Sequence, residues 1–137
     1  MLHATVEKLQ HSLFGETPFA RVLLVEQSDQ GVGVPLYYFR YSSFQARPGL
    51  WLDDLYLIPA VRHQGMGTAL MIHLVRIVQQ VNCTHIAWTA SVNNASGIRF
   101  YEKIGGTVLE QRQDLFYFQL DEASMRSLVH QGAIAAA

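Results

Sequence analysis

The segment Arg62-His63-Gln64-Gly65-Met66-Gly67-Thr68 lies between an apolar run typical of a strand and a long helical pattern. The first main-chain N–H groups of a helix have no partner within it, and the helix dipole adds partial positive charge there. The glycines let a ligand approach the backbone closely, and Arg62 adds a permanent cation. The segment therefore predicts a pyrophosphate site. It lacks the third glycine of a dinucleotide fingerprint and the Gly-Lys-Ser/Thr ending of a P-loop, and a simple tight turn is the alternative.

The elements that must hold this segment follow one another in an α/β order, within a single domain over residues 1–137. Helical and alternating apolar spacings distinguish the helices from the strands, and a turn is expected over residues 28–33. Asp121 is expected to cap a last helix ending at His130, before a frayed end over Gly132–Ala137. The other predicted helices are Leu2–Phe14, Thr68–Val81 and Asn94–Lys103, and the predicted strands are Ala20–Glu26, Val34–Tyr41, Leu50–Ile58, His85–Ala90, Thr107–Gln111 and Leu115–Leu120.

Two motifs in this order resemble the GNAT superfamily of N-acetyltransferases. R-x-x-G-x-G after a strand, here Arg62 to Gly67, is similar to the acetyl-CoA-binding motif of that family, and Asn94 to Gly105 resembles its N-x-x-A-x-x-F-Y-x-K-x-G block, with Gly97 in the usual place of alanine. The resemblance covers residues 19–118, and the segments LDDLYL and PLYYFRY look most like the spermidine/spermine (diamine) acetyltransferase branch. It implies a central mixed, mainly antiparallel sheet with flanking helices, in a chain that lacks the first strand and helix of the family.

The resemblance implies transfer of an acetyl group from acetyl-CoA to an amine. An alkyl amine, with a pKa of about 10.4, is mostly protonated at neutral pH, so a carboxylate must help to remove its proton. Asp53 and Asp54 are adjacent on a predicted strand, so we expect their side chains on opposite faces. The diamine branch has a glutamate at the position of Asp53, which implies that Asp53 is the base or amine anchor, acting through a water, with Asp54 as second candidate. For either residue, an ion pair or a loop cap is the alternative.

Tyr101 matches the tyrosine with which the family protonates the departing thiolate. A phenol, with a pKa of about 10, keeps its proton at neutral pH, and a ring packed in the core is the alternative. The family polarises the thioester carbonyl with main-chain N–H groups, here near Leu57 and Ile58. The resemblance implies an acetyl-CoA site formed by Leu55, Tyr56, Leu57, Ile58, Arg62, His63, Gln64, Gly65, Met66, Gly67, Thr68, Asn94, Ser96 and Tyr101.

The composition excludes several other classes of protein. The 137 residues are 50% hydrophobic and 15% charged, which indicates one compact core rather than a disordered chain. The net charge of −1 predicts no nucleic-acid partner, and the six histidines show no metal-ligand spacing. The single cysteine, Cys83, excludes an internal disulfide. The N-terminus lacks the apolar run of a signal peptide, and no apolar stretch predicts a membrane span, so we expect a cytoplasmic protein without a membrane partner.

The leading expectation is an N-acetyltransferase for the primary amine of a small molecule, with a polyamine or diamine as the first choice of acceptor. Two alternatives stay open: a catalytically weak CoA-binding module or sensor subunit, and a protein or peptide N-acetyltransferase. The low fraction of charged residues and an uncovered sheet edge also predict a homodimer. Its interface is expected on the first helix, at Leu2, Val6, Leu9 and Leu13, or on the strand pair around Leu115–Leu120.

Overall fold

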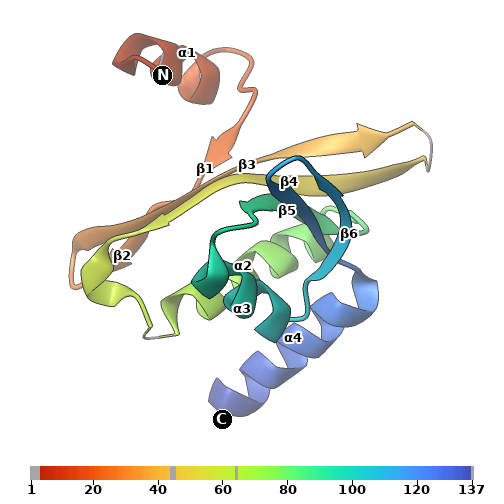
Figure 1. Ribbon diagram of the computed structural model, residues 1–137. Helices are drawn as coiled ribbons and strands as arrows, with labels where there is room; N and C mark the ends of the chain where they lie inside the picture. Colours follow the sequence, from red (N-terminus) through yellow and green to blue (C-terminus); the bar gives the residue numbers. More distant parts are fainter. Residues whose placement is uncertain (1–3, 44–45, 64, 137) are drawn as a thin grey trace.

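The computed structural model describes residues 4–43, 46–63 and 65–136 (Figure 1). The elements follow the predicted order, except that the first predicted strand is split into two short strands. They are α1 (Val6–Phe14), β1 (Arg21–Val22), β2 (Val25–Gln27), β3 (Gln30–Ser42), β4 (Arg47–Leu57), a 3₁₀ turn (Pro59–Val61), α2 (Met66–Gln80), β5 (Ile86–Ser91), α3 (Ala95–Lys103), β6 (Thr107–Arg112), β7 (Leu115–Leu120) and α4 (Glu122–Ala136).

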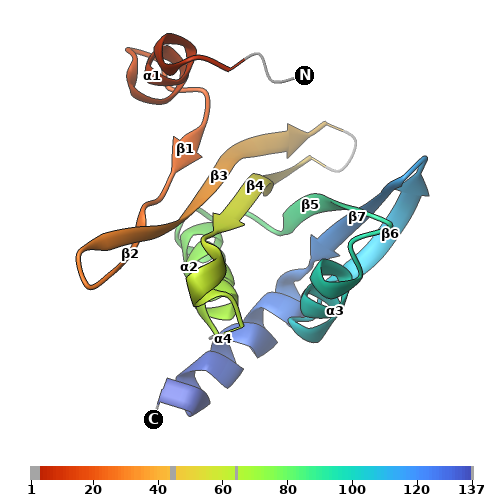
Figure 2. The ribbon, with the colours of Figure 1, turned by 60° about the vertical axis from the view of Figure 1, so that its left-hand side comes forward.

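The strands form one seven-stranded sheet in the order β1-β3-β4-β5-β7-β6, and β2 also pairs with β3. Among the described strands only the β4–β5 pair is parallel, which confirms the predicted mixed, mainly antiparallel sheet. Within the described residues, β4 and β5 are in register at two positions alone, Leu50 with Ile86 and Trp51 with Ala87. Beyond these pairs the two strands diverge (Figure 2). We call the part of the sheet where β4 and β5 separate the opening.

The helices α2, α3 and α4 lie together on one side of the sheet (Figure 1). The core fills the space between them and the central strands, and its members include Leu50, Leu52, Met71, Leu74, Val75, Val78, Ile86, Trp88, Phe118, Leu120, Met125 and Leu128. Helix α1 stands apart from the sheet in both views, and none of its residues is buried. We call the sheet surface away from α2, α3 and α4 the open face; it carries Arg40, Trp51 and Asp53.

A β-bulge in β4 changes the orientation of the two acids. Leu36 of β3 lies opposite Asp54, but the next residue lies opposite Leu52, so Asp53 is the extra residue. Leu52 before the bulge and Leu55 after it both pack towards the core. Asp53 and Asp54 therefore both lie away from the core, and both are exposed. The expectation that they face opposite sides is wrong, because it assumed a regular strand.

The hairpin between β2 and β3 is tighter than predicted. Its turn is only two residues long, Ser28 and Asp29, and both have positive φ values, 52° and 65°. Such turns match the right-handed twist of the paired strands. Consequently β3 begins at Gln30, four residues before the predicted start. In the same way, β4 begins at Arg47 rather than at Leu50.

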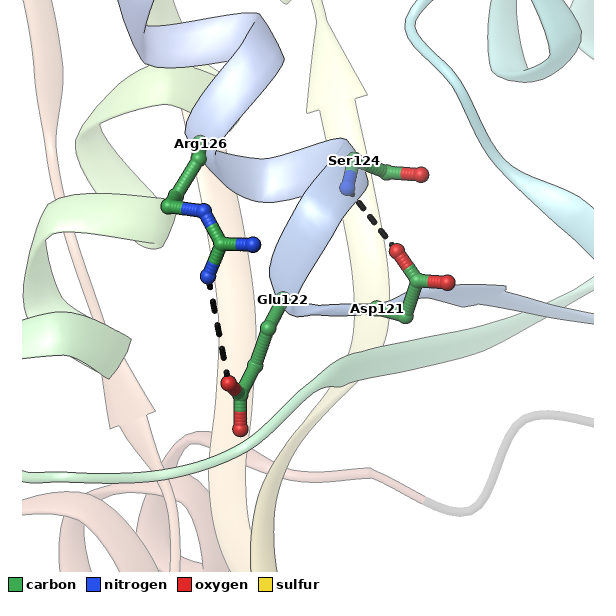
Figure 3. Close-up of polar contacts among 4 residues, drawn as sticks. All are labelled: Asp121, Glu122, Ser124 and Arg126. Atoms are coloured by element: carbon green, nitrogen blue, oxygen red, sulfur yellow. Dashed lines mark hydrogen bonds and ion pairs between the residues drawn. The ribbon is translucent and has the colours of Figure 1, made fainter.

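Capping side chains set the start of the two terminal helices. Helix α1 begins at Val6 because the Thr5 side chain accepts a hydrogen bond from the main-chain N–H of Lys8; the predicted residue Leu2 lies outside the described residues. Asp121 caps α4, as predicted, with its Oδ1 accepting from the N–H of Ser124 at 2.8 Å (Figure 3). An ion pair between Glu122 and Arg126, 4.0 Å apart, also lies on the first turn of α4 (Figure 3).

Helix α4 is longer than the sequence predicted. It continues beyond His130 to Ala136, over residues that were expected to be frayed. The last residues are mostly alanine, which has the highest helix propensity. Gly132 also lets α4 approach α2, because a Cβ atom there would lie 2.6 Å from Cδ1 of Ile72.

Candidate active site

The predicted general acid, Tyr101, lies beside the opening between β4 and β5. Tyr101, on α3, packs its ring against Trp88 of β5 and Phe118 of β7, with centroid distances of 5.2 and 5.3 Å. Phe100, the preceding residue, has its ring centroid 5.6 Å from that of Tyr101. The ring of Tyr101 is therefore held by aromatic contacts beside the part of β5 that diverges from β4.

The surroundings of Tyr101 favour its protonated form. Burial raises the pKa of the phenol above its ordinary value, and the negative charge of Asp54 raises it further. Both effects disfavour the phenolate. Tyr101 therefore holds a proton at neutral pH, as a general acid must, and Asp54 lies within electrostatic reach of it.

The two candidate carboxylates have different partners. The Asp53 carboxylate accepts a hydrogen bond from Nε1 of Trp51, 3.3 Å away on the open face. Of the two acids, Asp54 alone contributes to the pKa shift of Tyr101. The electrostatic effect thus favours Asp54, the second candidate from the sequence, as the carboxylate nearer to Tyr101. Asp53 belongs to the adjoining open face.

The predicted phosphate site is the N-terminus of α2. Gly65 is the N-cap, with a φ of 78°, a left-handed conformation that glycine adopts readily. No described side chain caps this turn, and the first bond within the helix runs from the N–H of Ala69 to the carbonyl of Gly65 at 3.0 Å. The N–H groups of Met66, Gly67 and Thr68 are therefore available to an anion.

Gly67 and Arg62 also make contacts that connect neighbouring elements of the fold. A Cβ atom at Gly67 would lie 3.1 Å from Cζ of Phe100, so the glycine also allows α2 and α3 to approach each other. Nε of Arg62 donates to the carbonyl of Leu57 at 2.9 Å, and the guanidinium lies 5.7 Å from the ring centroid of Tyr56. Arg62 thus connects the loop before α2 to the end of β4.

Two other residues of the predicted phosphate segment are His63 and Gln64. His63 has a positive φ of 64°, which turns the chain towards α2. Gln64 lies outside the described residues.

Not all of the main-chain N–H groups predicted at the end of β4 are available to donate a hydrogen bond to a ligand. The N–H of Ile58 already donates to the carbonyl of Val32 at 2.9 Å, so this predicted donor is not available. Hydrogen bonds alternate along an antiparallel strand, and Leu55 lies opposite Pro35, which has no N–H group. By this alternation the N–H groups of Leu55 and Leu57 point towards the opening. These two are the donors in position to polarise a carbonyl oxygen.

The second motif forms the capped start of α3. Oδ1 of Asn94 accepts from the N–H of Gly97 at 3.1 Å, so Asn94 caps the helix as predicted. A Cβ atom at Gly97 would overlap the side-chain amide of Asn94. Ser96 is exposed on the first turn of α3.

One pair of residues beside the site was not recognised in the sequence. The guanidinium of Arg40 lies over the ring of Trp51, 4.2 Å from its centroid. Trp51 is half-buried on the open face, whereas Trp88 is in the core. The pairing depends on the register of β3 and β4, and the sequence alone does not reveal that register.

The described part of the chain holds neither a group of metal ligands nor a helix able to cross a membrane. No group of three or more His, Cys, Asp or Glu side chains there is placed to hold a metal ion. No helix of residues 4–43, 46–63 and 65–136 is long and apolar enough to cross a membrane.

The sheet with its central opening, the uncapped α2 and the tyrosine on α3 define an acyltransferase-like site. The model of the acetyltransferase (GNAT) family matches residues 3–106 of this chain, so the chain belongs to that family. The family and the fold predicted from the two motifs are thereby confirmed.

Individual relatives agree with this assignment. The chain is 28% identical over 144 residues to thialysine N-ε-acetyltransferase of Mus musculus, covering 91% of this chain and 84% of that protein. It is 30% identical over 132 residues to spermidine/spermine N(1)-acetyltransferase-like protein 1 of Homo sapiens, covering 88% of this chain and 19% of that protein. The fold is similar to that of the PaiA N-acetyltransferase from Thermoplasma acidophilum in complex with coenzyme A, with a TM-score of 0.67, 18% identity and coverage of 76% of this chain and 62% of that chain.

Proposed function

We propose that this protein transfers the acetyl group of acetyl-CoA to a primary amine of a small molecule. The placement of Tyr101 and Asp54 at the opening of the sheet, next to the uncapped N-terminus of α2, carries the proposal. Family membership and the names of the relatives, thialysine N-ε-acetyltransferase and spermidine/spermine N(1)-acetyltransferase-like protein 1, support the same reaction.

The α2 N-terminus fits the pyrophosphate of the donor substrate. The N–H groups of Met66, Gly67 and Thr68 and the charge of Arg62 provide anion contacts there. A thioester arm entering the opening from this end comes to lie along β4. The N–H groups of Leu55 and Leu57 then face its carbonyl.

The proposed transfer is a direct one. The neutral amine nitrogen forms a bond to the acetyl carbonyl carbon, and its proton passes to Asp54 through a water. The carbon–sulfur bond then breaks, and the thiolate takes the proton of the Tyr101 hydroxyl. The products are the N-acetylated amine and free coenzyme A.

An acceptor panel tests this proposal. The purified chain is mixed with acetyl-CoA and, in turn, with polyamines, amino acids that carry a side-chain amine, aminoglycosides and peptides, and the release of the CoA thiol is followed. A matched reaction without any amine corrects for hydrolysis. The proposal expects amine-dependent thiol release and the acetylated amine by mass spectrometry. Tight binding of CoA with no transfer to any amine would instead identify a binding module.

Assembly and location are further parts of the proposal. We infer a homodimer, supported by apolar side chains that α1 leaves exposed, among them Val6 at 68% and Phe14 at 75% exposed. Light scattering should report twice the mass of one chain, and a monomer would overturn the inference. We also propose a cytoplasmic location, supported by the single cysteine, Cys83. Fractionation of cells carrying the tagged protein tests it.

A further inference from the structure

Three side chains on the open face form a connected group beside the opening. The Arg40 guanidinium lies over the Trp51 ring at 4.2 Å, and Nε1 of Trp51 donates to the Asp53 carboxylate at 3.3 Å. Arg40 comes from β3, whereas Trp51 and Asp53 come from β4. A positive charge therefore lies over the face of the indole ring, and a negative charge lies at its N–H edge.

Arg40 is held in place but keeps its hydrogen-bond donors. Within the described residues it forms no ion pair with a carboxylate. A guanidinium stacked on an aromatic ring directs its N–H groups outward, where they match a carboxylate in a bidentate manner. The charges of Arg40 and Arg47 both help to lower the pKa of His85, so other basic groups lie close by. This part of the open face therefore favours an anionic group.

The distances on the strand suit a molecule with an amine and a carboxylate. Side chains two positions apart on one face of a strand are about 7 Å apart, roughly the reach of a lysine or ornithine side chain. The helices cover the opposite surface of the sheet, so an acceptor reaches the opening from the open face. An amine placed at Asp53 and Asp54 then brings the far end of the same molecule over Trp51, beside Arg40.

We propose that Arg40, supported by Trp51, binds a carboxylate of the acceptor, so that the preferred substrates are amino acids with a side-chain amine rather than diamines. This inference rests on the proposed function. It differs from the polyamine expected from the sequence, because a diamine would bring a second cation against Arg40. Like charges in contact are unfavourable, and such a repulsive contact is a common source of specificity.

Two pairs of acceptors isolate the carboxylate. Ornithine differs from putrescine, and lysine from cadaverine, only by the carboxylate group. We expect the unmodified protein to have a lower KM for the amino acid of each pair. In Arg40→Gln that KM should rise by about tenfold to a hundredfold, the usual value of a charge-assisted contact, whereas the KM for the diamine should fall because the repulsion of its second cation is removed. Arg40→Lys should recover part of the preference.

Arg21→Gln is the matched control. Arg21 also stacks on an aromatic ring, that of Phe39 at 5.3 Å, but it lies on β1, away from this group. Its removal should leave the ratio of the two KM values unchanged. A preference for the diamine, or an equal loss in both arginine variants, would overturn the assignment of Arg40.

A binding measurement separates this inference from the proposed reaction. The indole N–H resonance of Trp51, assigned by its absence in Trp51→Phe, is followed while ornithine or putrescine is added. The inference expects a shift with ornithine that Arg40→Gln abolishes. If no amine is acetylated but this shift occurs, the reaction is wrong and the carboxylate site stands. If amines are acetylated but no such shift occurs, the carboxylate site is wrong.

Discussion

Asp54 of β4 and Tyr101 of α3 act on each other across the opening of the sheet: the carboxylate charge helps to hold the pKa of the phenol above its ordinary value. Tyr101 comes from the second of the two motifs that predicted the family, and Asp54 comes from the LDDLYL segment. A β-bulge at Asp53 directly precedes Asp54 in β4. A proton acceptor and a proton donor are thereby placed at the same opening.

Removing the charge of Asp54 should lower the pKa of Tyr101. In Asp54→Asn the raising effect of the carboxylate is lost, while the effect of burial remains, so the phenol should ionise at a lower pH than in the unmodified protein. Spectrophotometric titration, taken as a difference from Tyr101→Phe, measures this shift. Asp53→Asn is the control and should change the titration less. A larger change in the Tyr101 titration in Asp53→Asn than in Asp54→Asn would assign the nearby charge to Asp53.

A negative charge at the start of α2 should weaken CoA binding without weakening the fold. Thr68→Glu places a carboxylate in the first turn, where it favours the helix dipole but repels a pyrophosphate. We expect the affinity for CoA to fall by at least about tenfold while the melting temperature is maintained. Thr68→Gln is the neutral control. Gly67→Val is a poorer probe, because its side chain would meet Phe100. Equal CoA affinity in both Thr68 variants would contradict the phosphate placement.

The protein should lose stability in mild acid through His85. Burial, and then the charges of Arg40 and Arg47, lower the pKa of His85 below its usual 6.5. As the pH falls through about 6.5, the unfolded chain takes up this proton before the folded chain does, so the free energy of unfolding decreases. Urea unfolding at neutral pH and at about pH 5.5 measures the decrease. His85→Asn should reduce the decrease, whereas His130→Gln, at an exposed position on α4, should retain it; the same decrease in both variants would count against His85.

The cap of α4 should contribute measurably to stability. Asp121→Ala removes the acceptor of the Ser124 N–H and should cost about 1 kcal/mol of unfolding free energy. Asp121→Asn keeps an acceptor and should cost less. Chemical denaturation compares the three proteins. An equal loss in both variants would show that the charge of Asp121, rather than its hydrogen bond, stabilises the helix.

The sequence predicted the features that depend on local chemistry. The α2 N-terminus follows from the glycines after a strand, and the caps Asn94 and Asp121 follow from side chains that accept main-chain N–H groups. The order of the helices and strands followed from apolar spacing. Each of these depends only on residues close together in the chain.

Features that depend on contacts between strands were not predictable. The bulge at Asp53 and the stacking of Arg40 on Trp51 both require the register of β3 against β4. The preference for Asp53 over Asp54 as the catalytic carboxylate came from the resemblance to the diamine branch, and it stays a prediction. Likewise, the availability of the N–H groups of Leu55 and Leu57, and not that of Ile58, follows from pairing with β3.

The most direct test of Tyr101 as the general acid is to measure single-turnover acetyl transfer by Tyr101→Phe, together with the affinity of this variant for CoA. If Tyr101 protonates the departing thiolate, removal of the hydroxyl slows transfer by about 10²- to 10⁴-fold, because general acid catalysis has that value. The ring contacts with Trp88 and Phe118 do not involve the hydroxyl, so CoA affinity and the melting temperature should stay nearly unchanged. An unchanged transfer rate in this variant would contradict the assignment of Tyr101 as the acid.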